Sequence, residues 1–223
     1  MISKGRPWER PAAGPASWQV AGDDAALAAA VRDHPGARVG FAPGPASDLA
    51  RAIGLHGTAT DSGCGAIELG IDGLRVVADG RELFAVNMVV LGTAPDRVGW
   101  LTSSPDLRVE VDGRAVHHGP ATTVLVASGQ FLRGHDVVPR GHPGDGRVEV
   151  QVYALARGQR SGVRRRLPLG AHVPHPDITQ TAGRRIEVVA ARHPVGLELD
   201  GVTLPAAERV TVEVVPEAFL IVV

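Results

Sequence analysis

The pattern of apolar residues changes once along this chain, near residue 57, and that change constrains the fold more than any other feature. Before it, β-type runs alternate with helical runs, as SWQVA, DDAALAAAVRDH, ARVGFA and SDLARAIGL. Alternation of this kind is typical of a βαβα unit with parallel strands. After it, short β-type runs follow one another from AIELGI to FLIVV, with almost no helical periodicity. The sequence therefore predicts a small α/β lobe followed by a larger antiparallel β-domain.

Asp-Gly pairs punctuate the second part of the chain, in IDGLR, ADGRE, VDGRA and LDGVT. Asp-Gly between alternating strands favours a two-residue hairpin turn. We therefore expect a flexible tail at 1–16, an α/β lobe at 17–57 and an antiparallel β-sandwich at 58–223. One helix is predicted within the sandwich, near residues 156–169. Composition leaves open whether the last strands return to the small lobe.

Composition and charge exclude several classes of protein. The 223 residues carry a formal net charge of −1, so no overall basic field attracts nucleic acid or an anionic membrane. Cys64 is the single cysteine, which rules out an intrachain disulfide. No apolar run approaches the ~20 residues that a membrane-spanning helix needs, and the N-terminal stretch does not resemble a signal peptide. We therefore expect a cytoplasmic protein.

Two glycine-containing turns that open predicted helices are candidate phosphate sites. Their residues are Gly22, Asp23 and Asp24 in the first turn, and Gly44, Ser47 and Asp48 in the second. Free N–H groups at a helix start and the helix dipole both favour an anion. The same residue types are also ordinary helix N-caps, and Pro45 removes one backbone donor from the second turn. The residues alone leave both interpretations open.

The β-rich part contains further candidates. Asp145 lies in a loop rich in Gly, Pro and His, and Asp200 lies in LDGVT. An Asp before Gly commonly begins a turn, but Asp145 with neighbouring loop carbonyls could also coordinate Mg²⁺, which prefers oxygen ligands. His172 and His175 have zinc-compatible spacing without a third ligand nearby, which favours ordinary loop histidines.

One local cluster of basic residues stands out in the predicted helix near residues 156–169. Its members are Arg157, Arg160, Arg164, Arg165 and Arg166. Such a run is commonly a solvated helix face, and the alternative is a peripheral contact with anionic lipid headgroups.

The order of these motifs resembles that of the diacylglycerol kinase catalytic-domain family, bacterial lipid kinases related to sphingosine and ceramide kinases. That family shows a strand and GGDGT, then P-x-GTGND-x-A, a VANG strand, a P-x-A-x-x-x-DG-x-L loop and a late DGE. The corresponding stretches are AGDDAA at 21–26, PGPASDLA at 43–50, VASG at 126–129, PRGHPGDGRV at 139–148 and LDGVTL at 199–204. The resemblance begins near residue 17 and is closest over residues 121–223.

The resemblance implies ATP-dependent transfer of a phosphoryl group to the hydroxyl of a diacylglycerol-like lipid. It implies a fold similar to lipid kinases and NAD kinases, with the two glycine-containing turns around the nucleotide. It also implies a Mg²⁺ loop made by Asp145 with the carbonyls of His142 and Arg147. An acid near the DGE would act as base on the lipid hydroxyl.

Several residues depart from the family pattern. In the first turn Asp23 and Ala25 replace glycines, and in the second Pro45 replaces threonine. The glutamate of DGE is Val202, which leaves Asp200 as the nearest carboxylate for the catalytic role. Only some 17 residues precede the first matched strand, so we also expect the family's first βαβ segment to be missing.

Two hypotheses follow from these departures. The first is a diacylglycerol kinase-like enzyme with weak or lost phosphoryl transfer, which uses ATP and Mg²⁺ if it is active. The alternative is an inactive, pseudokinase-like module that binds a lipid, a nucleotide or a protein and needs no cofactor. A short lobe with exposed sheet edges also predicts pairing with another chain, such as a second copy in a homodimer.

Overall fold

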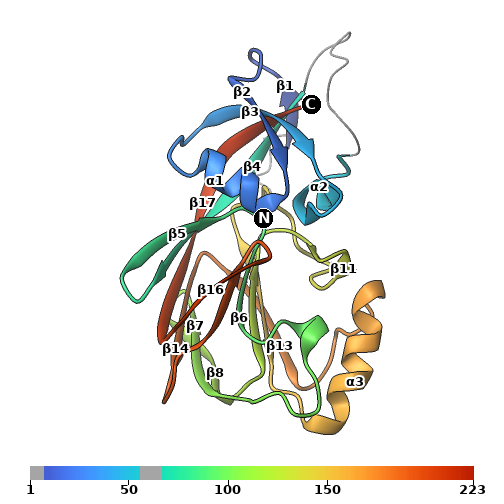
Figure 1. Ribbon diagram of the computed structural model, residues 1–223, viewed down its shortest axis with the longest axis vertical. Coiled ribbons are helices and arrows are strands. Elements are labelled where there is room, and N and C mark those ends of the chain that lie inside the picture. Colours follow the sequence, from blue (N-terminus) through green and yellow to red (C-terminus); the bar gives the residue numbers. More distant parts are fainter. Residues whose placement is uncertain (1–7, 56–66) are drawn as a thin grey trace.

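The computed structural model describes residues 8–55 and 67–223, which form a small lobe above a β-sandwich (Figure 1). The elements of the small lobe are β1 (Glu9–Pro11), β2 (Trp18–Gly22), α1 (Asp24–Val31), β3 (Ala37–Pro43) and α2 (Asp48–Ala52). Strands β2 and β3 are parallel, as the alternating pattern predicted. Strand β1 pairs with β4 (Ile67–Ala78), the first strand after the small lobe, so residues 9–11 of the predicted tail form a strand.

The first sheet has nine strands and extends through both lobes. Beyond β1, β2 and β3 it contains β4 (Ile67–Ala78), β5 (Arg81–Ala85), β7 (Asp106–Val111), β8 (Arg114–Pro120), β14 (Arg185–Ala190) and β17 (Arg209–Val222). Strand β17 is antiparallel to β4 and β14 in the sandwich, whereas its segment Phe219–Val222 runs parallel to β3. The last strand therefore returns to the small lobe.

The second sheet has six strands and lies entirely in the sandwich. Its strands are β6 (Met88–Gly92), β9 (Thr123–Ala127), β12 (Val148–Tyr153), β13 (Ile178–Gly183), β15 (Val195–Leu199) and β16 (Val202–Ala207). The remaining elements are η1 (Pro95–Arg97), β10 (Phe131–Leu132), β11 (His135–Asp136), α3 (Arg157–Arg166) and η2 (Leu167–Leu169). Helix α3 confirms the helix predicted near residues 156–169. None of the helices in the described residues is long and apolar enough to span a membrane.

Three apolar clusters hold these layers together. The largest fills the space between the two sheets and consists mostly of valine, leucine and isoleucine, as alternating strands require. A second cluster packs α1 and α2 against β3 and the upper ends of β4 and β17. A third joins α3 to the outer face of the second sheet. The small lobe is thus anchored on strands that continue into the sandwich.

Three of the four Asp-Gly pairs for which we predicted hairpins form them. They are Asp79-Gly80 between β4 and β5, Asp112-Gly113 between β7 and β8, and Asp200-Gly201 between β15 and β16. All six residues have positive φ, as a type I′ turn demands. Each aspartate also accepts backbone N–H groups from a neighbouring segment of chain, so each turn fastens its hairpin to another element.

The prediction of a hairpin at the fourth pair, Asp72-Gly73, is wrong, because β4 continues through it. The buried Asp72 carboxylate accepts the N–H of Gly146 at 2.6 Å and that of Glu217 at 2.9 Å. Its partner strand β17 has an irregularity between Val215 and Phe219 at this point. A Cβ at Gly73 would overlap the Phe84 ring, so this glycine permits close packing rather than a turn.

Two other boundaries differ from the sequence pattern. The run ELFAVNMVVL divides into β5 and β6, because the chain passes from the first sheet to the second at Val86 and Asn87. The runs RVTVEVV and FLIVV join into the single strand β17. No apolar run marks β8, β13 or β16 in the sequence, because exposed residues interrupt their alternation. Only the predicted Asp-Gly turns indicated β8 and β16.

Candidate functional site

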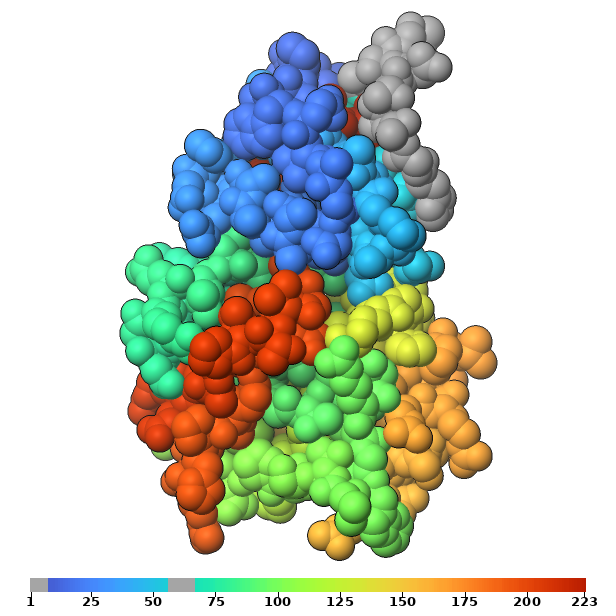
Figure 2. Space-filling model, in the orientation of Figure 1, coloured from blue at the N-terminus to red at the C-terminus, as the bar shows by residue number. Residues whose placement is uncertain are grey.

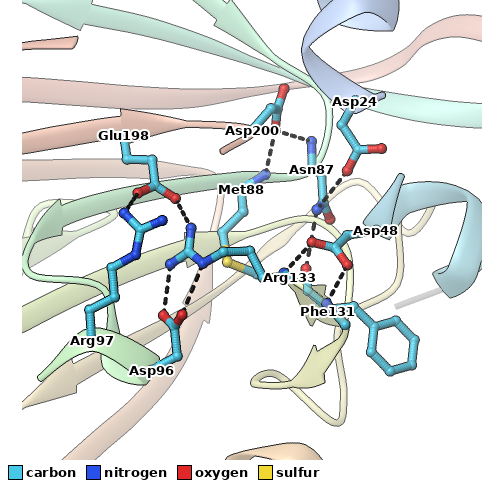
Figure 3. Close-up of polar contacts among 11 residues, drawn as sticks. Asp24, Asp48, Asn87, Met88, Asp96, Arg97, Phe131, Arg133, Glu198 and Asp200 are labelled. Atoms are coloured by element: carbon cyan, nitrogen blue, oxygen red, sulfur yellow. Dashed lines mark hydrogen bonds and ion pairs between the residues drawn. The ribbon is translucent and has the colours of Figure 1, made fainter. Parts of the chain in front are cut away.

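The two aspartates of the first predicted nucleotide turn have different roles. The exposed Asp23 side chain accepts the Ala26 N–H at 3.0 Å, so Asp23 is the N-cap of α1. Asp24 follows it and is only 4% exposed. Its carboxylate points into the junction between the lobes (Figure 3).

The Asp24 carboxylate lies at the start of α2, where we predicted a phosphate. One oxygen accepts the Ser47 hydroxyl at 2.6 Å, and the other accepts the Leu49 N–H at 3.0 Å. The amide of Asn87 also donates to Asp24, at 3.0 Å. The start of a helix is the end that attracts an anion. Here the Asp24 carboxylate lies at the start of α2, where we predicted a bound phosphate.

The second predicted turn uses its remaining donors within the small lobe. The Gly44 N–H donates to the carbonyl of Gly22 at 2.7 Å, and the Ser47 N–H donates to the carbonyl of Gly44 at 3.1 Å. The Ser47 hydroxyl accepts the Ala50 N–H at 3.0 Å and is the N-cap of α2. A cavity of about 260 Å³ lies beside this turn and is lined by Arg51 among other residues.

Asn87 connects the two lobes at the point where the chain changes sheets. Its side-chain amide donates to Asp24 and, at 3.2 Å, to the carbonyl of Phe131. Its backbone carbonyl accepts the N–H groups of Ser128 and Gly129, in the VASG stretch. Within the described residues the Asn87 Oδ1 and Ser128 Oγ atoms are buried without a hydrogen-bond partner. Asn87 is therefore fixed by donors and acceptors from four segments.

Asp200, the predicted catalytic residue, also binds the chain where it passes from β5 to β6. Its Oδ2 accepts the Val86 N–H at 2.8 Å. Its Oδ1 accepts the N–H groups of Asn87 at 3.0 Å and Met88 at 2.9 Å. The carboxylate thus satisfies three donors that would otherwise have no strand partner where β5 ends and β6 begins.

Burial changes the protonation of both carboxyl groups. Loss of solvation raises the pKa of Asp24 to about 6, with the negative charge of Asp48 adding to the effect. Loss of solvation, together with the negative charge of Asp24, raises the pKa of Asp200 to about 7. Each carboxylate therefore opposes the ionisation of the other, and both titrate close to neutral pH.

A cluster of ion pairs lies beside this network (Figure 3). Asp48 accepts the backbone N–H groups of Arg133 and Gly134. The Arg133 guanidinium donates two hydrogen bonds to Asp96, at 2.7 and 2.9 Å, and pairs with Glu198. Asp48 thus fixes the turn that presents Arg133, and its predicted role in nucleotide binding stays a prediction.

A mostly apolar groove of about 170 Å³ separates α1 from the β15–β16 hairpin. Its lining residues are Ala25, Ala28, Ala29, Arg32, Leu83, Phe84, Leu199, Asp200, Val202 and Leu204. Val202 is 46% exposed, so a side chain that cannot accept a proton occupies the predicted base position. Asp200 is the one carboxylate in the groove lining.

The predicted Mg²⁺ loop is held by contacts within itself and with two other segments of the chain. The Asp145 carboxylate accepts the Arg147 N–H at 3.1 Å, and the His142 Nδ1 accepts the Gly144 N–H at 3.2 Å. The His142 ring also packs edge-on against Trp8, with centroids 4.8 Å apart. Among residues 8–55 and 67–223, no group of three or more His, Cys, Asp or Glu side chains could hold a metal. The ligand set of Asp145 with the His142 and Arg147 carbonyls stays a prediction.

The other candidates have structural contacts. The buried His172 ring is within hydrogen-bond distance of the Tyr153 hydroxyl, at 3.1 Å. His175 accepts the Asp177 N–H through its Nδ1 at 3.1 Å. Cys64 lies outside the described residues.

Three residues of the junction were not predicted from the sequence: Asn87, Asp96 and Arg133. The sequence does mark Asn87, because it is a lone polar residue within the apolar run FAVNMVVL. Arg133 precedes Gly134 in an ordinary turn sequence, and its carboxylate partners are 37 and 65 residues away. Nothing local identifies that ion pair.

Comparison with known proteins shows the family of the chain through its second part. The model of the family described as "YegS C-terminal NAD kinase beta sandwich-like domain" matches residues 100–223, more than half of the chain. The chain belongs to this family. Its members' sandwich corresponds here to the part that contains Arg133, Glu198 and Asp200. No curated protein is similar enough in sequence to be matched.

Solved structures share the fold over both lobes at low sequence identity. A protein assigned as a diacylglycerol kinase from Bacillus anthracis str. Sterne has a TM-score of 0.72 and 14% identity, covering 91% of this chain and 76% of that chain. Yeast NADH kinase complexed with NADH has a TM-score of 0.53 and 13% identity, covering 92% of this chain and 60% of the other. An NAD kinase from Archaeoglobus fulgidus in complex with ATP has a TM-score of 0.51 and 12% identity, covering 92% and 76%. The predicted fold, an α/β lobe with a lipid kinase- or NAD kinase-like sandwich, is confirmed.

The packing of Gly129 against Asn87 predicts a destabilising substitution. In Gly129→Ala the added Cβ would overlap the Asn87 Oδ1 and displace an amide that joins the lobes. We expect the free energy of unfolding to fall by about 1–3 kcal/mol, as for other overpacked sites, measured by urea denaturation. Gly158→Ala is the control, because it meets open space within α3 and should be neutral or stabilising. Equal effects of the two substitutions would contradict the role given to Gly129.

Proposed function

We propose that this protein is a non-phosphorylating relative of the lipid kinases that binds a diacylglycerol-like lipid. The observation that carries the proposal is the Asp24 carboxylate at the start of α2, the position predicted for a nucleotide phosphate. A polyphosphate brought to that position would meet Asp24 and Asp48, whose charges repel it. The sequence also offers no lysine near either turn, since Lys4 is the only lysine.

The groove between α1 and the β15–β16 hairpin supports a lipid as the ligand. Its walls are mainly alanine, leucine, phenylalanine and valine side chains, with Asp200 at one side. A volume of about 170 Å³ is below the range of about 300–1,000 Å³ typical of complete small-molecule pockets. The groove therefore suits one part of a larger amphipathic molecule, such as a headgroup whose hydroxyl reaches Asp200.

Calorimetric titration with ATP, with and without Mg²⁺, tests the loss of nucleotide binding. We expect no saturable heat at millimolar ATP for the wild-type protein, because the anion position is filled. An Asp24→Asn variant, which keeps the shape of the side chain, is titrated in parallel. The proposal would be refuted if the wild-type protein bound ATP with micromolar affinity and the Asp24→Asn variant did not.

The lipid part of the proposal is tested separately with a soluble short-chain diacylglycerol. Ala29 is exposed and lines the groove, so Ala29→Leu should fill part of it and weaken binding by about tenfold or more, equivalent to about 1.4 kcal/mol. Ala29→Ser keeps the groove open and serves as the matched control. Equal affinity of the two variants would place the lipid elsewhere.

Weak ATP-dependent phosphorylation of a lipid hydroxyl is the second candidate function. One observation favours it: a carboxyl whose pKa is about 7 is well matched to general-base catalysis near neutral pH. Within the described residues the Asp200 Oδ2 accepts only the Val86 N–H, which leaves one lone pair for a hydroxyl proton. Phosphoryl transfer to diacylglycerol that rises through pH 7 and disappears in Asp200→Asn would favour this candidate over the first.

A further inference from the structure

The loop that follows η1 presents two large apolar side chains to solvent. Trp100 is 63% exposed and Leu101 is 88% exposed. Single exposed apolar residues are common on protein surfaces, so exposure by itself assigns nothing. What distinguishes this pair is the structure that holds it in place.

A buried arginine fixes the loop from beneath. Arg160 in α3 is 5% exposed, and its guanidinium donates to the carbonyl oxygens of Gly99, Trp100 and Thr102 at 3.2, 3.3 and 2.7 Å. It also donates to the Ser104 hydroxyl at 2.8 Å. Burying an arginine without a carboxylate is costly. In return, these four bonds fix the backbone of the loop that carries Trp100 and Leu101.

Exposed arginines flank this loop along α3. Arg157 and Arg164 lie three and four residues from Arg160 and so share its side of the helix, and Arg165 follows. All three are exposed, and within the described residues none has a carboxylate partner. Arg164 donates to the carbonyl of Val98 at 3.3 Å, at the base of the same loop. Helix α3 contains no acidic residue, so the charge of this flank is uncompensated.

Figure 2 shows the two segments side by side on the surface of the sandwich, with the green atoms around residue 100 next to the orange atoms of α3. We infer that Trp100 and Leu101, with Arg157, Arg164 and Arg165, form a docking surface for anionic phospholipid membranes. Tryptophan and leucine favour the interface of a bilayer, and arginine pairs with lipid phosphates. The net charge of −1 argues against nucleic acid, whose binding a local patch without a wider basic field supports poorly.

This inference does not depend on the lipid bound in the groove, and the experiment keeps the two apart. The full-length protein is sedimented with vesicles of phosphatidylcholine alone, or of phosphatidylcholine and phosphatidylglycerol in equal parts, neither containing diacylglycerol. We expect binding to the anionic vesicles only, weakened by salt. Tryptophan emission should shift to the blue on binding, since Trp100 is the exposed tryptophan among Trp8, Trp18 and Trp100.

Two double variants divide the surface into its apolar and charged parts. Trp100→Ala/Leu101→Ser should remove the emission shift and most of the binding. Arg157→Gln/Arg165→Gln should weaken binding by on the order of tenfold while leaving the tryptophan in place. Arg81→Gln/Arg114→Gln removes the same charge from two hairpin ends of the first sheet and should bind as the wild type does.

Two results would overturn the inference. The first is wild-type protein that stays in the supernatant with both kinds of vesicle. The second is an equal loss of binding in the Arg81→Gln/Arg114→Gln control, which would show that binding depends on the net charge of the protein and not on this surface. The protein could fail to bind vesicles while light scattering shows a dimer that Trp100→Ala/Leu101→Ser dissociates. In that case the surface is an interface with a second copy of the chain.

Discussion

Replacing Arg133 with methionine is expected to lower the free energy of unfolding by on the order of 3 kcal/mol. The Arg133 guanidinium neutralises Asp96 and Glu198, whose side chains are only 14% and 10% exposed. In the variant Asp96 would lose its paired guanidinium, and among the described residues Glu198 would keep only Arg97, at 3.5 Å. The methionine side chain fills much of the volume. Removing one partner of a buried ion pair is costly because the charge left behind is neither solvated nor compensated.

Urea denaturation of Arg133→Met, beside a matched control, measures this effect. The control is Arg75→Met, which breaks the pair of Arg75 with Glu213 on an exposed part of the first sheet. An exposed pair contributes about 0–1 kcal/mol, so the control should remain close to the wild type. If Arg133→Met costs no more than Arg75→Met, the cluster does not hold the junction.

The stability of the protein is expected to increase as the pH falls from about 8 to about 5. Burial raises the pKa of Asp24 and of Asp72 to about 6, and that of Asp200 to about 7. An aspartate with a raised pKa in the folded state binds its proton more tightly there than in the unfolded chain. Acidification through that pKa therefore stabilises the fold, by up to about 1.4 kcal/mol per pH unit for each carboxyl that titrates.

The trend should reverse at lower pH, because other carboxyls have the opposite shift. Arg10 and Arg38 lower the pKa of Glu68 against the effect of its burial, and Arg133 lowers that of Asp96 in the same way. Their contribution is present above the unfolded pKa and is lost as the pH falls through the lower folded value. A maximum of stability near pH 5 is thus expected.

Unfolding measured in urea over a series of pH values checks this profile. Asp200→Asn should flatten the slope between pH 8 and 6, because it removes the aspartate with the highest pKa of the three. Asp33→Asn, which changes an exposed side chain in the segment after α1, should leave the slope intact. A wild-type stability that rises steadily from pH 5 to pH 8 would show that these carboxyls are not desolvated in the fold.

The sequence predicted the fold well where local signals decide the structure. Three Asp-Gly hairpins formed as expected, because the positive φ of a type I′ turn selects those residues directly. The hairpin predicted at the fourth pair did not form, because Asp72 accepts hydrogen bonds from backbone groups 74 and 145 residues away. A dipeptide carries no information about such partners.

The candidate site shows the same limit in its chemistry. The sequence identified Asp24, Ser47, Asp48 and Asp200 as important, and the structure brings these residues to the lobe junction with Glu198. Their roles depended on Asn87 and Arg133, which reach them across 63 and 85 residues of chain. Composition could not tell whether a carboxylate faced a phosphate or another part of the same protein.

Strand β17 has a consequence for how the molecule assembles. Every other described element precedes it in the sequence, yet it lies at the centre of the first sheet and also pairs with β3. Neither lobe can close its sheet until this strand has been inserted between partners that are far away along the chain. Contacts of such long sequence separation slow folding, and a late central strand leaves sheet edges exposed meanwhile. We therefore expect the two lobes to fold as one cooperative unit rather than in succession.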